Sequence, residues 1–286
     1  MKTIRELLDI VCDVSDPIDM RYYDRFDKPD LPSEALEMLA AYAYPRAEAF
    51  GHWMTEQGFD TTYDGFIYHG TRGRNVICTK GTPRHWCVAH HDYWGGVGAD
   101  DNGSGLSVMM DCAQGIERDD IGFISFDLEE AGRIGSRKFT QEYDIRGIHS
   151  LLCIDTVSSG EGVMAAFSTL TASGPCSELF EETYTCSDEE LVNSFTKGAR
   201  DIGYRVYPGY MMGGSSDSKS FPLKVPKLSL YSFMHAGNHD GWYGKGLKGY
   251  TNHEIVHTEK DCPDNIDQRS LAAVSHAVRN YLEDLP

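Results

Sequence analysis

The order of apolar and polar positions predicts short buried strands that alternate with amphipathic helices. In the first part of the chain, apolar residues recur at helical spacing across residues 34–57, with Ser33 as the expected N-cap and Pro45 as an expected kink or break. Shorter β-like runs follow near 66–69, 75–79 and 85–90.

The alternation continues through the second part of the chain. Strands are expected at IGFISF (121–126), HSLLCID (149–155) and KLSLYSF (227–233). Helices are expected near 103–116, 134–143, 187–202 and 265–285. This order is typical of α/β proteins, whose central sheet is buried on both faces. We therefore predict an α/β fold of the three-layer sandwich type, with a mixed central β-sheet flanked by helices on both faces.

The length of 286 residues allows one large core, and we interpret residues 1–286 as a single catalytic domain. Residues 1–60 are expected to form helices that pack on it. The stretches 205–222 and 235–256 are rich in Gly, Tyr and Met and are placed as loops over the sheet edge, so that residues 205–256 form a substrate-loop region.

Charge narrows the classes of partner. The formal net charge of -18 argues against nucleic acid or an anionic membrane as a binding partner, because phosphate binding uses clustered Lys and Arg.

The N-terminal segment MKTIRELLDIVCDV resembles an amphipathic helix rather than a secretory signal, and no apolar run is long enough to span a membrane, so a cytoplasmic location is expected. The eight cysteines lack zinc spacing and are expected to be free thiols, with Cys176 and Cys186 the one pair worth testing for a bridge.

Candidate chemistry is concentrated in five short segments, most of which follow apolar runs. They hold His90 and Asp92, then Asp101, then Glu129 and Glu130, then Asp155, and finally His257. In an open α/β sheet, ligands gather at the carboxyl ends of the strands, so several of these side chains should converge. Together they could bind two adjacent divalent cations and leave one Glu as a base.

The position of each residue within its segment suggests its role. Residues two apart on an extended segment point the same way, so Asp92 can orient His90 while His91 faces the other side. Asp101 lies in the glycine-rich loop GVGADDNGSG and is the candidate bridging ligand; a calcium loop is disfavoured there because no helix precedes it and no Glu closes it. Adjacent side chains diverge at Glu129 and Glu130, so one can bind metal while the other stays free.

The segments HHD, ADDNGSG, DLEEAGRIGS, CIDT and VHTEKDCPDNID, in this order, resemble the motifs of co-catalytic di-zinc aminopeptidases of the bacterial leucyl aminopeptidase type, metallopeptidase family twenty-eight. The resemblance covers roughly residues 75–280. It implies that one zinc is bound terminally by His90 and Asp155 and the other by Glu130 and His257. It also implies Asp101 as the bridge and Glu129 as the general base.

The resemblance further implies a cofactor of two Zn²⁺ ions, for which cobalt or manganese could substitute, and hydrolysis of N-terminal residues from short peptides through a metal-bridging hydroxide. Carboxypeptidase, amidohydrolase or glutaminyl cyclase-like activity on the same scaffold stays open. A metal-stabilised binding protein without turnover is a further alternative. The oligomeric state is left open.

Some positions depart from the family pattern. Val256 stands where many members have Tyr, so an oxyanion-binding phenol would come from elsewhere, with Tyr243 and Tyr250 as candidates. Ser218 replaces a common His, and Arg133 replaces an aliphatic residue; Arg133 could meet a substrate carboxylate or form a surface salt bridge. His253 competes with His257 as the last ligand, and His257 is preferred because the family motif continues after it.

Overall fold

A computed structural model describes residues 1–19, 31–159, 162–172, 181–184, 188–204, 206–212, 216–235, 247–250, 252 and 254–286. Its helices are α1 (Ile4–Cys12), α3 (Ser33–Glu56), α4 (Gly105–Ala113), α5 (Ile134–Glu142), α6 (Glu189–Asp201) and α7 (Gln268–Glu283). Its strands are β1 (Asp60–Tyr68), β2 (Thr71–Thr79), β3 (His85–His90), β4 (Ile121–Phe126), β5 (Ser150–Asp155), β6 (Gly162–Ala172), β7 (Glu181–Tyr184), β8 (Val206–Met212), β9 (Lys227–His235) and β10 (Leu247–Tyr250).

Within the described ranges, the strands form one ten-stranded mixed sheet in the order β1-β2-β4-β3-β5-β9-β10-β8-β6-β7. The central strands β4, β3, β5 and β9 run parallel, whereas β1 and β2 pair antiparallel at one edge. Every residue of β4 and β5 is buried, as continuous apolar sequences such as IGFISF require in a sheet covered on both faces.

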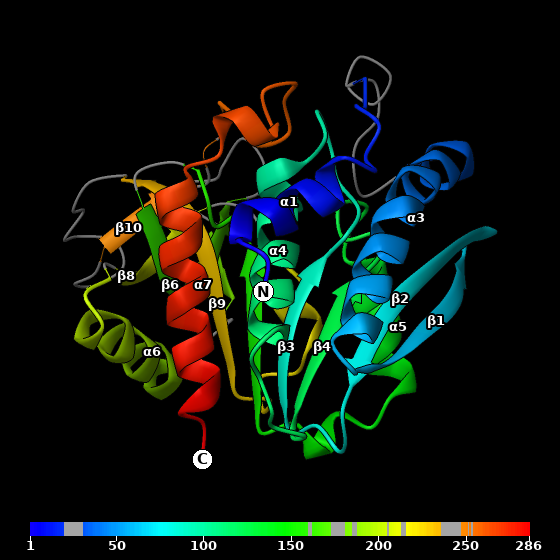
Figure 1. Cartoon of the computed structure of the whole chain (residues 1–286). Coiled ribbons are helices and arrows are strands. Elements are labelled where there is room, and N and C mark those ends of the chain that lie inside the picture. The colour runs from blue at the N-terminus through cyan, green and yellow to red at the C-terminus, as the bar shows by residue number, and fades with distance from the viewer. Residues whose placement is uncertain are drawn as a thin grey trace.

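Side chains that alternate along the strands separate into two cores. Cys87 and Phe123 pack in the larger core with residues from helices α1, α3, α4, α6 and α7. Val88 and Ile124, one position further along the same strands, pack in the other core with Phe139 of α5. Figure 1 shows α1, α4 and α7 in front of the sheet. The predicted three-layer α/β sandwich is therefore confirmed.

Some local predictions were wrong. The first long helix begins at Ser33 itself after Pro32, and the Ser33 hydroxyl donates to the carbonyl of His69 at 3.1 Å instead of capping the helix. The helix also continues through Pro45 without a break. The region 205–256 is not only loop, because β8 and β10 lie within it and pair in parallel.

Two further expectations concern cysteines and membranes. The cysteines of the described ranges are free thiols, and all but Cys262 are buried. Cys176 and Cys186 lie outside the described residues, so their pairing stays a prediction. Among the helices that can be described, none has both the length and the apolar character required to cross a bilayer.

Candidate metal centre

The carboxyl ends of three parallel strands carry the first candidate side chains. Strand β3 ends at His90 and β5 at Asp155, while β4 ends just before the segment that contains Glu129 and Glu130. Because β3 pairs in parallel with both β4 and β5, these ends meet at one edge of the sheet. The sheet thus brings together residues that are up to 65 positions apart in sequence, as the distance from His90 to Asp155 illustrates.

Asp101 reaches this edge from the loop that leads into α4. It lies in the η2 segment (Ala99–Ser104), where its backbone is not helical, with φ -108 and ψ 88. The carboxylate of Asp261 accepts the backbone N–H of Asp100 at 2.6 Å and that of Asp101 at 3.1 Å. On the other side, the Asn102 side chain donates to the carbonyl of Ile154 at 2.8 Å. These contacts fix the loop between β5 and the segment after His257.

His257 arrives from a different part of the chain and completes the cluster. Its backbone lies in the left-handed region at φ 61, within the turns that follow Asn252. Its Nε2 lies 2.9 Å from Oδ2 of Asp101 and 3.1 Å from Oε1 of Glu130. The ring is partly exposed, whereas the two carboxylates are buried.

The ligand atoms form two groups that share one residue. In the first, Nε2 of His90 lies 3.2 Å from Oδ1 of Asp101 and 3.6 Å from Oδ1 of Asp155. In the second, His257 faces Glu130 and the other oxygen of Asp101. Each group offers three ligand atoms that all lie within 4.8 Å of one another. Asp101 therefore turns one carboxylate oxygen toward each group.

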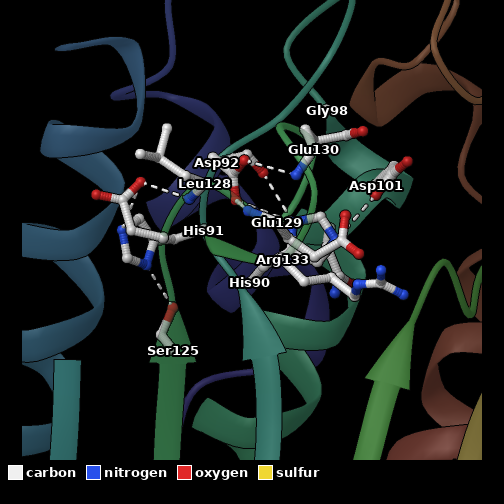
Figure 2. Close-up of polar contacts among 12 residues, drawn as sticks. His90, His91, Asp92, Gly98, Asp101, Ser125, Leu128, Glu129, Glu130 and Arg133 are labelled. Carbon is white, nitrogen blue, oxygen red and sulfur yellow. Dashed lines mark hydrogen bonds and ion pairs between the residues drawn. The ribbon is translucent and has the colours of Figure 1, made fainter. Parts of the chain in front are cut away.

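Asp92 supports this cluster mainly through the backbone. Its Oδ1 accepts the N–H of Glu129 at 2.9 Å and its Oδ2 that of Glu130 at 3.0 Å (Figure 2). Nδ1 of His90 lies 3.0 Å from the carbonyl oxygen of Asp92 and 3.4 Å from its carboxylate. A proton on Nδ1 bonded to that carbonyl leaves Nε2 of His90 available as a ligand. His91 faces away and contacts Ser125 Oγ at 2.8 Å.

The residues present fit a bound cation. The buried Nε2 of His90 makes no hydrogen bond of good geometry, although carboxylate oxygens surround it. Such an orphaned imidazole nitrogen beside acidic oxygens is what a mixed N/O metal site presents without its ion. His and carboxylate ligands together suit zinc.

The electrostatics of the cluster agree with this interpretation. Burial opposes ionisation of Asp101, but its interactions with the imidazole rings of His257 and His90 outweigh this effect and hold its pKa well below the usual range. Burial raises the pKa of Asp155, and the neighbouring His90 ring only partly offsets this effect. Bound cations would supply the positive charge that the rings of His90 and His257 provide here, and they would keep the carboxyl groups ionised.

Glu129 differs from the five clustered residues. It is partly exposed and belongs to neither three-residue group. Burial raises its pKa well above the usual range, while the charge on His90 acts in the opposite direction. A raised pKa on a carboxyl group outside both ligand groups is typical of a residue that accepts and releases a proton.

Sequence reasoning missed two buried carboxyl groups near this edge. Asp217, in the η4 turn (Asp217–Ser220), is fully buried, and burial raises its pKa to about 7. Asp261 is equally buried, and burial followed by the charge of Asp100 raises its pKa to about 8. Asp261 lies in the segment VHTEKD, four residues after His257, and this closeness to a candidate ligand is the sequence feature that could have indicated it.

The departures from the family pattern are accounted for only in part. Val256 is buried. The Ser218 hydroxyl accepts a hydrogen bond from Ser229 at 2.9 Å, and Lys227 donates to the Ser218 carbonyl at 3.0 Å, so Ser218 is bonded within the fold. The backbone N–H of Arg133, which precedes α5, donates to the carbonyl of Glu129 at 2.7 Å. His253 and Tyr243 lie outside the described residues, as does the side chain of Tyr250.

The model of peptidase family M28 matches residues 75–282, which contain all five clustered residues. The chain belongs to peptidase family M28. No curated protein resembles it closely enough to count as a match. The family assignment confirms the resemblance inferred from the motifs.

Solved M28-like structures share the fold. Glutaminyl cyclase of Porphyromonas gingivalis is 18% identical with a TM-score of 0.60, covering 88% of this chain and 98% of that one. LapA aminopeptidase of Legionella pneumophila is 15% identical with a TM-score of 0.61, covering 97% and 73%. BSAP, a zinc aminopeptidase from Bacillus subtilis, is 20% identical with a TM-score of 0.57, covering 76% of this chain and 51% of that one. The chain thus spans about half the length of BSAP.

Proposed function

We propose that this chain is a di-zinc exopeptidase that removes the N-terminal residue of short peptides. One observation carries the proposal: the two oxygens of Asp101 face two separate ligand groups, one around His90 and one around His257. A carboxylate shared in this way is suited to bridging two ions. Asp155 would complete the first site and Glu130 the second.

The charges of the ligand set also favour two cations over none. The carboxylates of Asp101, Glu130 and Asp155 carry three negative charges when ionised, and two divalent cations would more than neutralise them. When bound, paired zinc ions acidify water and polarise the carbonyl of a scissile amide. Cobalt and manganese could occupy the same ligands.

The protein's own residues would move the proton. Glu129 is outside both ligand groups, and the Asp92 carboxylate accepts its N–H, which holds its backbone next to the ligand Glu130. We assign it the role of general base, which takes a proton from the attacking water and passes it to the departing amine. Asp92 would act by orienting both Glu129 and His90.

The substrate is expected to be a short peptide or related amide. The strong negative charge disfavours nucleic acid as a partner, and it suits recognition of a protonated N-terminal amine near acidic side chains. We place the substrate-binding region among the segments between residues 205 and 256, which include η4 and its buried Asp217.

A glutaminyl cyclase is the second candidate. The P. gingivalis glutaminyl cyclase matches over 98% of its own length, whereas BSAP matches over only 51% of its length. The chain thus matches nearly the whole length of the cyclase but only about half the length of BSAP.

One assay separates these activities. The zinc-loaded protein is incubated with dipeptides whose ends are free, N-acetylated or C-amidated, and with a peptide that begins with glutamine. Cleavage that acetylation abolishes and amidation leaves intact is the expected result. Ammonia release from the glutamine peptide without cleavage would favour the cyclase. Cleavage lost only on amidation would favour a carboxypeptidase, and no reaction with any substrate would favour a binding protein.

A further inference from the structure

An arginine from the N-terminal helix α3 is buried beside the loop that carries Asp101. The side chain of Arg46 is completely buried and is the largest such side chain in the described residues. Its Nη2 donates to the carbonyls of Val97 and, at 2.8 Å, Gly98. Its Nε donates to Ser15 Oγ at 2.8 Å. The guanidinium therefore ties the N-terminal segment to residues 97–98.

The surroundings of Arg46 fix its position. Its guanidinium carbon lies 4.3 Å from the centre of the Tyr93 ring, within cation–π distance. Ser15 donates in turn to the carbonyl of Val11 in α1 at 2.7 Å. A buried arginine gives little net stability over apolar packing, because desolvation offsets its attractions. Its hydrogen bonds to one short loop point instead to a role in setting that loop's conformation.

Two side chains of opposite charge bind this loop, one through its backbone carbonyls and the other through its backbone N–H groups. Arg46 donates to carbonyls at 97 and 98, whereas the Asp261 carboxylate accepts the N–H groups of Asp100 and Asp101. Asp261 also accepts the N–H of Val97 at 3.0 Å through its own carbonyl. The segment that ends in Asp101 is therefore bonded at both of its ends.

The loop is packed so tightly that movement near Gly98 would reach Asp101. Gly98 lies at φ 53, and a Cβ there would be 2.3 Å from Cβ of Tyr93 and 2.5 Å from the carbonyl oxygen of Asp101. Gly98 also accepts the N–H of Gly103 at 3.0 Å, across the turn that contains Asp101. Loss of the Arg46 contacts would let this turn shift as a unit.

We propose that Arg46 is a positioning residue that holds the Asp101 loop in the conformation needed for metal binding. The proposal rests on the proposed function for the role of Asp101 as a ligand. Because Asp101 is shared between both ligand groups, loosening its loop should weaken both binding steps together. A change in one terminal ligand, by contrast, should weaken mainly one.

The test measures zinc dissociation constants by competition with a chromophoric chelator, at a temperature where circular dichroism shows each variant folded. Arg46→Met should weaken both steps by at least about tenfold, the range known for residues that orient metal ligands. Arg46→Lys, which keeps a charge and donors, should recover part of that loss. Arg74→Met is the control. Arg74 of β2 also packs on α3, the helix that carries Arg46, because its guanidinium carbon lies 3.7 Å from the ring centre of Tyr44 and its side chain pairs with Glu48. No hydrogen bond joins Arg74 to residues 97–101.

Unchanged zinc constants in folded Arg46→Met, with only a lower melting temperature, would reduce Arg46 to a structural role and overturn the proposal. If Arg46→Met does not fold, Arg46→Gln, which can reach fewer acceptors, decides by the same criterion. Peptide cleavage by the zinc-loaded wild type is assayed separately. A protein that binds zinc through Arg46-dependent sites but cleaves no peptide would refute the proposed function and leave this inference standing.

Discussion

The carboxylate of Asp92 holds the backbone of Glu129, whose N–H it accepts at 2.9 Å. The same carboxylate accepts the N–H of the next residue, Glu130, at 3.0 Å. One buried side chain thus fixes the backbone of both the candidate base and a candidate ligand. Asp92 lies two residues beyond His90, so it also connects the end of β3 with the segment after β4.

We predict that Asp92→Asn lowers kcat/KM by about tenfold to a hundredfold while the protein stays folded. An amide can accept only one of the two N–H groups through its oxygen, and its NH₂ would oppose the other donor. The control is Asp127→Asn, because Asp127 accepts the N–H groups of Arg74 and Leu128 at 2.9 and 2.8 Å but belongs to neither ligand group. An equal loss in both variants would argue for a general effect of buried carboxylates.

We predict that Glu129→Gln retains zinc but loses turnover by a factor of about 10² to 10⁴, the usual contribution of a general base. The substitution keeps the size of the side chain and removes its ability to accept a proton. Zinc content and kcat are measured on the same preparation. Retained activity would remove Glu129 from the role of base, whereas loss of zinc would make it a ligand.

We predict that the metal-free protein becomes less stable as the pH rises from about 5 to about 8. Buried Asp217 and Asp261 have pKa values raised to about 7 and about 8, mainly by burial. A carboxyl group whose folded pKa is raised stabilises the fold in its protonated form. This contribution is lost as the pH rises from the ordinary Asp pKa of 3.8 to the folded value. Asp101, whose pKa is lowered chiefly by His257 against the effect of burial, is already ionised in this range and adds no slope.

Urea denaturation in the presence of a chelator, at several pH values, measures this dependence. Asp261→Asn should flatten it by about 1 kcal/mol per pH unit below the folded pKa, since one fewer group titrates. Asp188→Asn serves as the control, because Asp188 caps α6 through the N–H groups of Glu190 and Leu191 and is exposed. An unaltered slope in Asp261→Asn would show that Asp261 does not titrate as inferred.

Much of the cluster could be predicted from sequence because parallel strands align their carboxyl ends. Once HWCVAH and SLLCID were identified as neighbouring buried strands, convergence of His90 and Asp155 followed from the topology. His257 has no such local signal, and its candidacy depended on the resemblance to a known family. Its contact with Asp101 spans a long sequence separation that hydrophobic periodicity does not encode.

The residues that escaped prediction act through such distant contacts. Arg46 is a polar position within a helical segment, and only the structure shows its contact with the carbonyls of residues 97 and 98. Loop is expected from sequence over the residues of β8, VYPGYMM, because the stretch is rich in Gly, Tyr and Met. Pairing with β6 and β10 overrides that local preference.

The zinc content of the purified protein tests the central claim most directly. Metal analysis after dialysis against a weak chelator should give two zinc ions per chain for the wild type and one for Asp155→Asn, which removes a ligand from a single group. His91→Gln, a change next to His90 that faces Ser125, should retain both ions. A wild-type protein saturated by one ion would contradict the paired centre built around Asp101.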